Sequence, residues 1–277
     1  MAARIRRLRN ELKAGPENVT VERVQEDFNK VDGLYGRAKL DFVPILEIAA
    51  RTGRVDIIQT LLYNGCELSA PIYQAAVNGG STAVFEAFLQ SGQWEINYPC
   101  MKDDQPVLGF VCKDLTLTNW FFENGADPNI MNSKGVTPLS KAVGDAPSEM
   151  VEYFIQHGGL VDRGWLFNYA VRRDSEEIEV VDILVRHLKI LKSEDMGEVV
   201  KCLNRVEYDG HFDDCHIYNR PFTPLNEAVA NGKEALVRHL ISKGADPNTP
   251  DGWNRNALEW AEQLHPELED VIKNPLG

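Results

Sequence analysis

Short apolar stretches with helical spacing recur along the chain, and polar residues and glycines separate them. The segment 235–241 places its leucines, valine and isoleucine on one side of a helix, and Gly244 follows where a left-handed residue closes a helix. Upstream of it, the hydroxyl of Thr223 can cap a helix whose first position is Pro224, where the missing N–H costs nothing. This pattern predicts pairs of short antiparallel helices.

Two short motifs occur twice, which indicates a repeat protein. Gly-Ala-Asp-Pro-Asn stands at 125–129 and again at 244–248, and Thr-Pro-Leu stands at 137–139 and at 223–225. These residues resemble the ankyrin repeat, a helix-turn-helix unit of about 33 residues followed by a projecting β-turn, with a T-P-L-H-x-A signature. The resemblance extends over roughly residues 40–273 and implies an all-α solenoid of six to seven stacked units.

The same register places the repeat starts at seven positions, which are Pro44, Ala70, Gln105, Thr137, Trp165, Thr223 and Asn256. We therefore expect an N-terminal helical cap over 1–40, with a helix at 20–32, and a repeat domain over 41–273. The intervals before Ala70 and Trp165 are short and leave little room for the projecting turn. The interval after Trp165 is 58 residues, 25 more than the 33-residue period, which predicts an insertion at 186–219 with a helix at 194–206 and a polar loop after it.

The net charge of −13 changes the expected partners. The first forty residues hold nine Lys and Arg against six Asp and Glu, so the predicted repeats carry nearly all of the negative charge. An acidic body disfavours nucleic acid and membrane surfaces and favours a basic protein segment. The N-terminal segment 2–12 is basic and amphipathic. It has three interpretations: a helix packed on the cap, a patch for a nuclear or acidic partner, and a transit peptide.

Cysteine usage and hydropathy bear on the compartment. The five cysteines are widely spaced with no C-x-x-C pair, which favours neither a disulfide framework nor a zinc ribbon. The sequence has no apolar run of eighteen residues and no secretory signal. We expect a cytoplasmic protein, with a nuclear location left open, that is monomeric and needs no cofactor and no metal.

The resemblance implies protein binding through a concave surface made of the turn tips and the inner helices. Trp253, beside an Asp-Gly turn, is the leading candidate anchor, although its ring can also fold back over the last repeat. Trp165 either faces a groove or fills the core, and Arg172 and Arg173 either lie in a solvated turn or form a cationic spot. The candidate binding residues are Tyr73, Lys134, Trp165, Asn168, Arg172, Arg173, Arg220, Trp253 and Arg255.

The inserted loop supplies an alternative of another class. Imidazoles and carboxylates can ligate zinc or move protons, and the loop 207–220 is rich in both. The groups concerned are His211, Asp213, Asp214, His216 and Tyr218. Their spacing matches no zinc or hydrolase signature, and the sequence has no nucleotide-binding motif. The alternative is a small-molecule enzyme with isomerase- or cyclase-type acid/base chemistry, in which Arg172 or Arg173 orients an anionic substrate.

Overall fold

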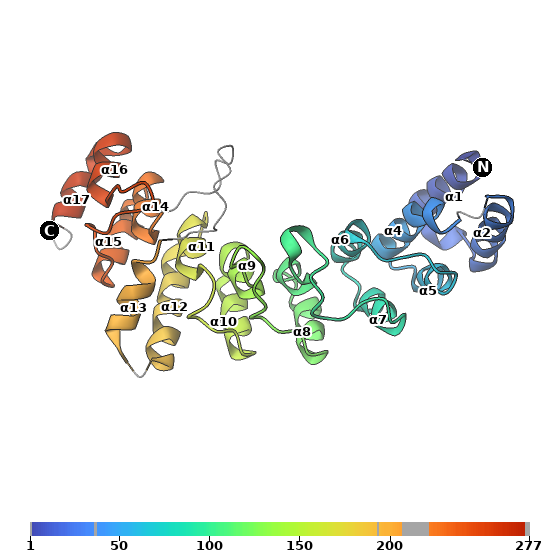
Figure 1. Ribbon diagram of the computed structural model, residues 1–277, viewed down its shortest axis with the longest axis horizontal. Coiled ribbons are helices and arrows are strands. Elements are labelled where there is room, and N and C mark those ends of the chain that lie inside the picture. Colours follow the sequence, from blue (N-terminus) through green and yellow to red (C-terminus); the bar gives the residue numbers. More distant parts are fainter. Residues whose placement is uncertain (1, 36–37, 193, 207–221, 275–277) are drawn as a thin grey trace. The chain divides into compact units, whose positions relative to one another are not determined.

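A computed structural model describes residues 2–35, 38–192, 194–206 and 222–274 of the chain (Figure 1). Every regular element in these ranges is a helix, and the chain divides into two compact units, 1–127 and 128–277. The all-α prediction is confirmed.

Unit 1 begins with a helical cap and continues with helix pairs. Its elements are α1 (Ala2–Ala14), η1 (Pro16–Asn18), α2 (Val21–Tyr35), α3 (Ala38–Asp41), α4 (Val43–Thr52), α5 (Val55–Tyr63), α6 (Ala70–Gly79), α7 (Thr82–Gln90), η2 (Lys102–Asp104), η3 (Val107–Phe110) and α8 (Leu115–Glu123). Helix α4 packs between α1 and α6. Leu8 and Leu12 of α1 are fully buried, so the basic N-terminal segment is part of the fold, as the first of its three interpretations expects.

The repeat starts predicted at Ala70 and Gln105 are followed by elements of different length. Helix α6 starts at Ala70 as predicted and packs so closely on α4 that a Cβ on Gly79 would lie 2.6 Å from the carbonyl oxygen of Arg51. The unit predicted to start at Gln105 has instead only the short 3-10 turn η3. Pro106 stands at the start of that turn and Gly109 lies within it, where a glycine disfavours a longer helix.

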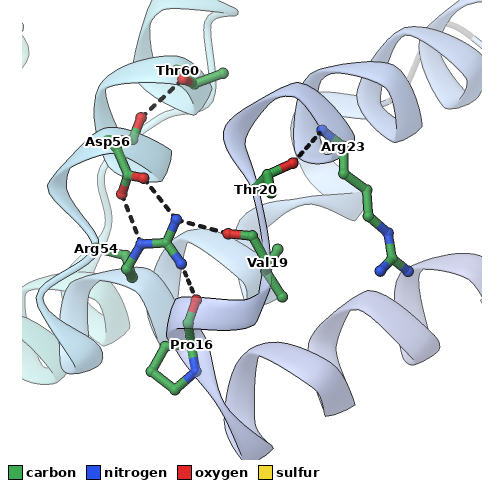
Figure 2. A network of polar contacts seen from close by, with 7 residues as sticks. All are labelled: Pro16, Val19, Thr20, Arg23, Arg54, Asp56 and Thr60. Carbon is green, nitrogen blue, oxygen red and sulfur yellow. Dashed lines mark hydrogen bonds and ion pairs between the residues drawn. The ribbon is translucent and has the colours of Figure 1, made fainter.

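Arg54 ties the cap of unit 1 to the first helix pair (Figure 2). Its guanidinium donates to the carbonyl oxygens of Pro16 and Val19, the latter at 2.7 Å, and forms a two-pronged pair with Asp56 at 2.9 and 2.6 Å. The hydrogen bonds from Arg54 are the main reason that the pKa of Asp56 lies below its ordinary value. One side chain at the start of α5 therefore holds the loop that joins α1 to α2.

Unit 2 is built from pairs of one inner and one outer helix. Its elements are α9 (Pro138–Asp145), α10 (Ser148–Gln156), α11 (Leu166–Arg172), α12 (Glu177–Leu191), α13 (Met196–Leu203), α14 (Pro224–Ala230), α15 (Glu234–Ser242), α16 (Ala257–Leu264), η4 (Pro266–Leu268) and α17 (Glu269–Lys273). We call α9, α11, α14 and α16 the inner helices and α10, α12, α15 and α17 the outer helices. The inner helices pack side by side in that order, along the upper row of unit 2 in Figure 1.

The predicted helix starts of unit 2 are confirmed, and three of the four have side-chain caps. The hydroxyls of Thr137 and Thr223 accept hydrogen bonds from backbone N–H groups three residues on, and so does the side chain of Asn256. Trp165 occupies the same position before α11 but makes no such side-chain bond. Thr, Thr and Asn are strong capping residues, whereas an indole cannot accept a hydrogen bond there.

Asparagine side chains clamp neighbouring repeats together. Asn129 donates to the carbonyl oxygen of Gly158 at 2.9 Å and accepts from the backbone N–H of Leu160 at 2.8 Å. The same pair of bonds joins Asn97 to Gly125 and Asp127, and joins Asn204 to Gly244 and Asp246. We call Asn97, Asn129 and Asn204 the amide clamps.

The amide clamp at Asn204 belongs to the predicted insertion. The helix expected at 194–206 is present as α13, and it packs on α12. A Cβ on Gly244, at the end of α15, would lie 2.8 Å from a methyl carbon of Val200 in α13. This part of the insertion is therefore packed into the stack, and the predicted polar loop 207–219 lies outside the described residues.

Candidate functional site

Two projecting turns of unit 2 are built in the same way. At one, the side chain of Asn132 accepts from the N–H groups of Lys134 and Val136, at 3.0 and 2.8 Å. At the other, Asp251 accepts from the N–H groups of Trp253 and Arg255, at 2.8 and 3.0 Å. Each turn is closed by a backbone bond across four residues, and both end just before an inner helix. Lys134 and Trp253 thus occupy equivalent tip positions, and both are exposed.

Trp165 takes the place of the projecting turn that the short interval before α11 omits. Its indole N–H donates to the carbonyl oxygen of Lys134 at 3.3 Å, so the ring lies against the tip of the preceding repeat. The guanidinium of Arg205 stacks over the ring, 4.2 Å from its centroid. Trp165 is half-buried, intermediate between the open groove and the core packing that its sequence position allowed.

Aromatic rings gather around the second turn. Trp253 packs edge-on against Phe222, with the ring centroids 5.4 Å apart, and lies 5.9 Å from Trp260. The indole of Trp260 donates to Asp251 at 2.7 Å, and Arg255 stacks 4.8 Å over its ring. Trp253 does fold back over the last repeat, yet 45% of its surface stays exposed. It is held in place and remains accessible.

Three of the predicted binding residues hold the fold together. Tyr73 is 4% exposed and packs against Phe88 and Trp94. Asn168 is buried and donates to the carbonyl oxygen of Phe222 at 2.9 Å. The sequence placed both residues on a contact surface, and their burial argues against that role. The prediction rested on helix spacing, which does not tell which side of an inner helix the neighbouring repeats cover.

Arg173 is the third, and both of its sequence interpretations are wrong. It is 7% exposed, and one of its terminal nitrogens donates to the carbonyl oxygens of Val143 and Ala146 at 2.7 and 2.8 Å, at the end of α9. The side chain also pairs with Glu176 at 3.0 Å. It is a buried clamp for a helix C-terminus. Its neighbour Arg172 is partly exposed and pairs with the buried Glu227 at 3.2 Å.

A groove lies between the outer helices α10 and α12, and none of its lining residues was among the candidates from the sequence. It has a volume of about 670 Å³ and a floor that includes Ile178 and Ile183. Arg186 is the cation among its lining residues. Six carboxylates line the groove, and these are Glu149, Glu152, Glu176, Glu177, Glu179 and Asp182. We call this the acidic groove.

Two carboxylates of the acidic groove, Glu152 and Asp182, form ion pairs. Glu152 pairs with Arg186 and His187, and Asp182 pairs with Lys243 at 2.6 Å and with His239 at 3.0 Å. Burial acts to raise the pKa of Asp182, but Lys243 and His239 outweigh it and the pKa lies below its ordinary value. The groove is therefore anionic at neutral pH.

Three of its carboxylates lack a cationic partner among the described residues. They are Glu149, Glu177 and Glu179. The signal for this groove was present in the sequence as acidic residues on the segments 149–152 and 176–182. Pairing of the two outer helices was needed to bring them together.

The residues of the enzymatic alternative belong to the inserted loop. His211, Asp213, Asp214, His216 and Tyr218 lie outside the described residues, as does Arg220. Within the described ranges, no group of three or more His, Cys, Asp and Glu side chains is arranged to hold a metal ion. Over the same ranges, no helix is both long and apolar enough to cross a membrane. Arg172 and Arg173, which that alternative uses to orient a substrate, are engaged as described above.

Comparison with known proteins identifies the repeat. Residues 222–252 match the ankyrin repeat family model. No curated protein matches the chain in sequence. Three solved structures with 17–20% sequence identity share the fold.

The first of these is the ankyrin repeat domain of Bcl-3, described as a unique member of the IkappaB family, with a TM-score of 0.51 over 80% of this chain and 96% of that one. The human ASB11 ankyrin repeat domain has a TM-score of 0.54, over 84% and 97%. The third is a structure of the predatory endopeptidase Bd0816 from Bdellovibrio bacteriovorus in complex with the immunity protein Bd3460, with a TM-score of 0.52 over 76% and 97%.

Proposed function

From the ankyrin-repeat fold of this chain, we propose that it is a protein-binding adaptor that holds a basic segment of a partner in the acidic groove of unit 2. Ankyrin repeats generally mediate protein–protein interaction, and stacked short helices give a rigid surface that loses little conformational entropy on binding. The third structural neighbour comes from a complex between an endopeptidase and an immunity protein, which agrees with such a role. The inner-helix face and the turn tips remain further contact surfaces in this proposal.

The observation that carries the proposal is the acidic groove itself. A short basic segment can enter this groove, and Ile178, beside the mostly buried Ile183, offers apolar contact for the stem of a lysine or arginine side chain. Glu149, Glu177 and Glu179 stand ready to pair with the charged ends, because no described residue neutralises them. The partner chemistry that fits is a basic segment with alternating apolar positions.

A charge-reversal experiment tests this proposal. The triple variant Glu149→Lys, Glu177→Lys, Glu179→Lys changes exposed or half-exposed side chains and leaves the helix cores intact. The variant removes three exposed ion pairs between these glutamates and the basic ligand. At about 0.7 kcal/mol for each pair, the affinity should fall roughly 30-fold. The readout is fluorescence anisotropy with a labelled lysine- and leucine-rich peptide at two salt concentrations.

The matched control reverses three exposed carboxylates elsewhere, Glu67, Glu95 and Glu262. It changes the net charge by the same amount. If both triple variants lose affinity equally, general attraction to an acidic protein explains the binding and the groove has no specific role. If neither changes it, the proposed site is wrong.

A further inference from the structure

The arginines of unit 2 fall into two groups by their partners. Four of the seven described arginines form ion pairs with carboxylates, and these are Arg172, Arg173, Arg186 and Arg238. Arg163, Arg205 and Arg255 have no carboxylate partner among the described residues. All three are exposed, and all three lie on the side of unit 2 where the inner helices begin. In a chain with a net charge of −13, cations without a carboxylate partner gathered on one edge require an explanation.

Two of these arginines are held on tryptophan rings. Arg205 stacks on Trp165 at 4.2 Å, and Arg255 stacks on Trp260 at 4.8 Å. Stacking occupies the face of the guanidinium and leaves the N–H groups at its edge for a carboxylate, which such an edge binds with two parallel hydrogen bonds. Arg255 uses one edge nitrogen on the exposed amide of Gln263, a neutral acceptor that a carboxylate can displace. Each guanidinium is thus positioned before any ligand arrives.

An apolar anchor lies beside the second of these arginines. Trp253 is 45% exposed and is braced by Phe222 and Trp260, so a ligand side chain can pack on a ring whose position is already fixed. Tryptophan and arginine are the residues that most often dominate binding energy at protein interfaces. The edge therefore combines cationic and aromatic anchors on a rigid support.

We infer that this edge, formed by Trp165, Arg205, Trp253 and Arg255, is a second binding surface of unit 2 and takes an acidic protein segment. We call it the turn edge. Carboxylates of the segment pair with Arg205 and Arg255, and an apolar side chain between them packs on Trp253. This surface is separate from the acidic groove and has the opposite charge preference, so the adaptor has two surfaces for two kinds of partner.

The spacing of the two arginines sets the register of the segment. Arg205 lies over the residue that precedes α11, and Arg255 immediately precedes the cap of α16. These inner helices are separated by α14, and two helix-to-helix steps amount to about 16–20 Å. An extended peptide crosses that distance in about six residues. The ligand is therefore a segment with two acidic residues about six positions apart.

A nucleic acid strand is the competing occupant, since stacked arginines and exposed tryptophans also bind single strands. The carboxylates near the edge argue for a protein segment instead. Glu259 and Glu262 lie on α16, directly beyond Arg255, and would repel a continuous phosphate backbone. A peptide that carries charge at only two points avoids them.

The test uses fluorescence anisotropy with the full chain and three labelled ligands. One is a peptide with two glutamates about six residues apart and a leucine between them. The second replaces both glutamates with glutamine, and the third is a single-stranded oligonucleotide of similar length. We expect the glutamate peptide to bind at least about 10-fold more tightly than the glutamine peptide, because glutamine cannot form the charge-assisted hydrogen bonds to either arginine.

The variants Arg205→Gln and Arg255→Gln should each weaken the glutamate peptide by about 10-fold, and Arg205→Lys should restore only part of the loss, because an ammonium keeps the charge without the planar fork. Arg238→Gln is the matched control, since Arg238 lies in an exposed pair on α15. A peptide whose two glutamates are only about three residues apart should lose as much affinity as a single arginine variant loses, because it cannot reach the second arginine. Circular dichroism and thermal melts of the variants should match the wild type.

Equal binding of the glutamate and glutamine peptides, or binding unaffected by both arginine variants, would overturn the inference. Tighter binding of the oligonucleotide with the same arginine dependence would also overturn it. The triple reversal in the acidic groove should not weaken the glutamate peptide. Loss of basic-peptide binding alone therefore reports on the proposed function, and loss of arginine-dependent acidic-peptide binding reports on the turn edge.

Discussion

Replacement of Arg54 by alanine should release the helical cap of unit 1 without unfolding the rest of the chain. Arg54 donates to the carbonyl oxygens of Pro16 and Val19 and pairs with Asp56 (Figure 2). The alanine variant leaves both carbonyls without their donor. The apolar packing of α1 on α4 is untouched, so the change isolates the polar tie.

The expected loss follows from the exposure of the groups. A hydrogen bond from a charged donor to a carbonyl contributes about 1.5 kcal/mol at the low end, and the variant removes two of them. The side chain of Asp56 is 48% exposed, so its pair with Arg54 adds only a few tenths of a kcal/mol. Water can reach Pro16, which is half-buried, and offsets part of the loss there. We expect about 2–3 kcal/mol, or roughly a 30- to 160-fold rise in the opening equilibrium of the cap.

Hydrogen exchange followed by mass spectrometry measures that opening segment by segment. Amides of α1 and α2 should exchange faster by the stated factor, and amides of α9 to α12 should not change, because stacked repeats contact only their neighbours. Arg51→Ala is the matched control, since Arg51 is exposed and its side chain has no hydrogen bond or ion pair with the described residues. Rates within about threefold of that control would refute the role of Arg54. A uniform increase in both units would refute the nearest-neighbour argument.

Four further outcomes are expected. Arg173→Ala should lower the urea midpoint of unit 2 by the equivalent of about 3 kcal/mol, because two helix-end carbonyls lose a charged donor, whereas Arg238→Ala should cost less than about 0.5 kcal/mol. Asn129→Ala removes both bonds of an amide clamp and should cost about 1–2 kcal/mol in the same assay. The depressed pKa of Asp56 means that its contribution is complete above about pH 4 and is lost as the pH falls through its folded-state pKa, so the stability gap between wild type and Asp56→Asn should close on acidification. Burial raises the pKa of Cys66 to about 11, so iodoacetamide at about pH 8 should label this thiol only after unfolding, as peptide mass spectrometry can show.

The parts of the fold that follow from local rules were predictable from the sequence. A capping side chain followed by proline starts a helix by chemistry that spans four residues, and Thr137 and Thr223 do so as expected. Glycine at the end of each pair closes a helix by its freedom at positive φ, as Gly244 does at +104°. Even the added helix α13 was visible in its apolar spacing. These features need no knowledge of what packs where.

The candidate surfaces depend on packing, and there the sequence was a weaker guide. Arg173 looked like a solvated charge because acidic residues surround it in the chain. It does pair with one of them, Glu176, but it is buried because it also donates to carbonyls about thirty residues away. The acidic groove needs two outer helices side by side before its carboxylates meet. Arg205 was not among the candidate residues, because only the fold brings it onto Trp165.

The amide clamp at Asn204 makes the extra residues of this chain part of its architecture. Evolution or design can shorten a surface loop freely when nothing else relies on it. Here α13 delivers Asn204 to the backbone at Gly244 and Asp246, so the last helix pairs depend on a segment that a regular repeat does not have. Deleting 186–206 would bring the interval nearer to the ordinary period but would leave the backbone at Gly244 and Asp246 without these two hydrogen bonds. A redesigned array would have to supply another amide in its place.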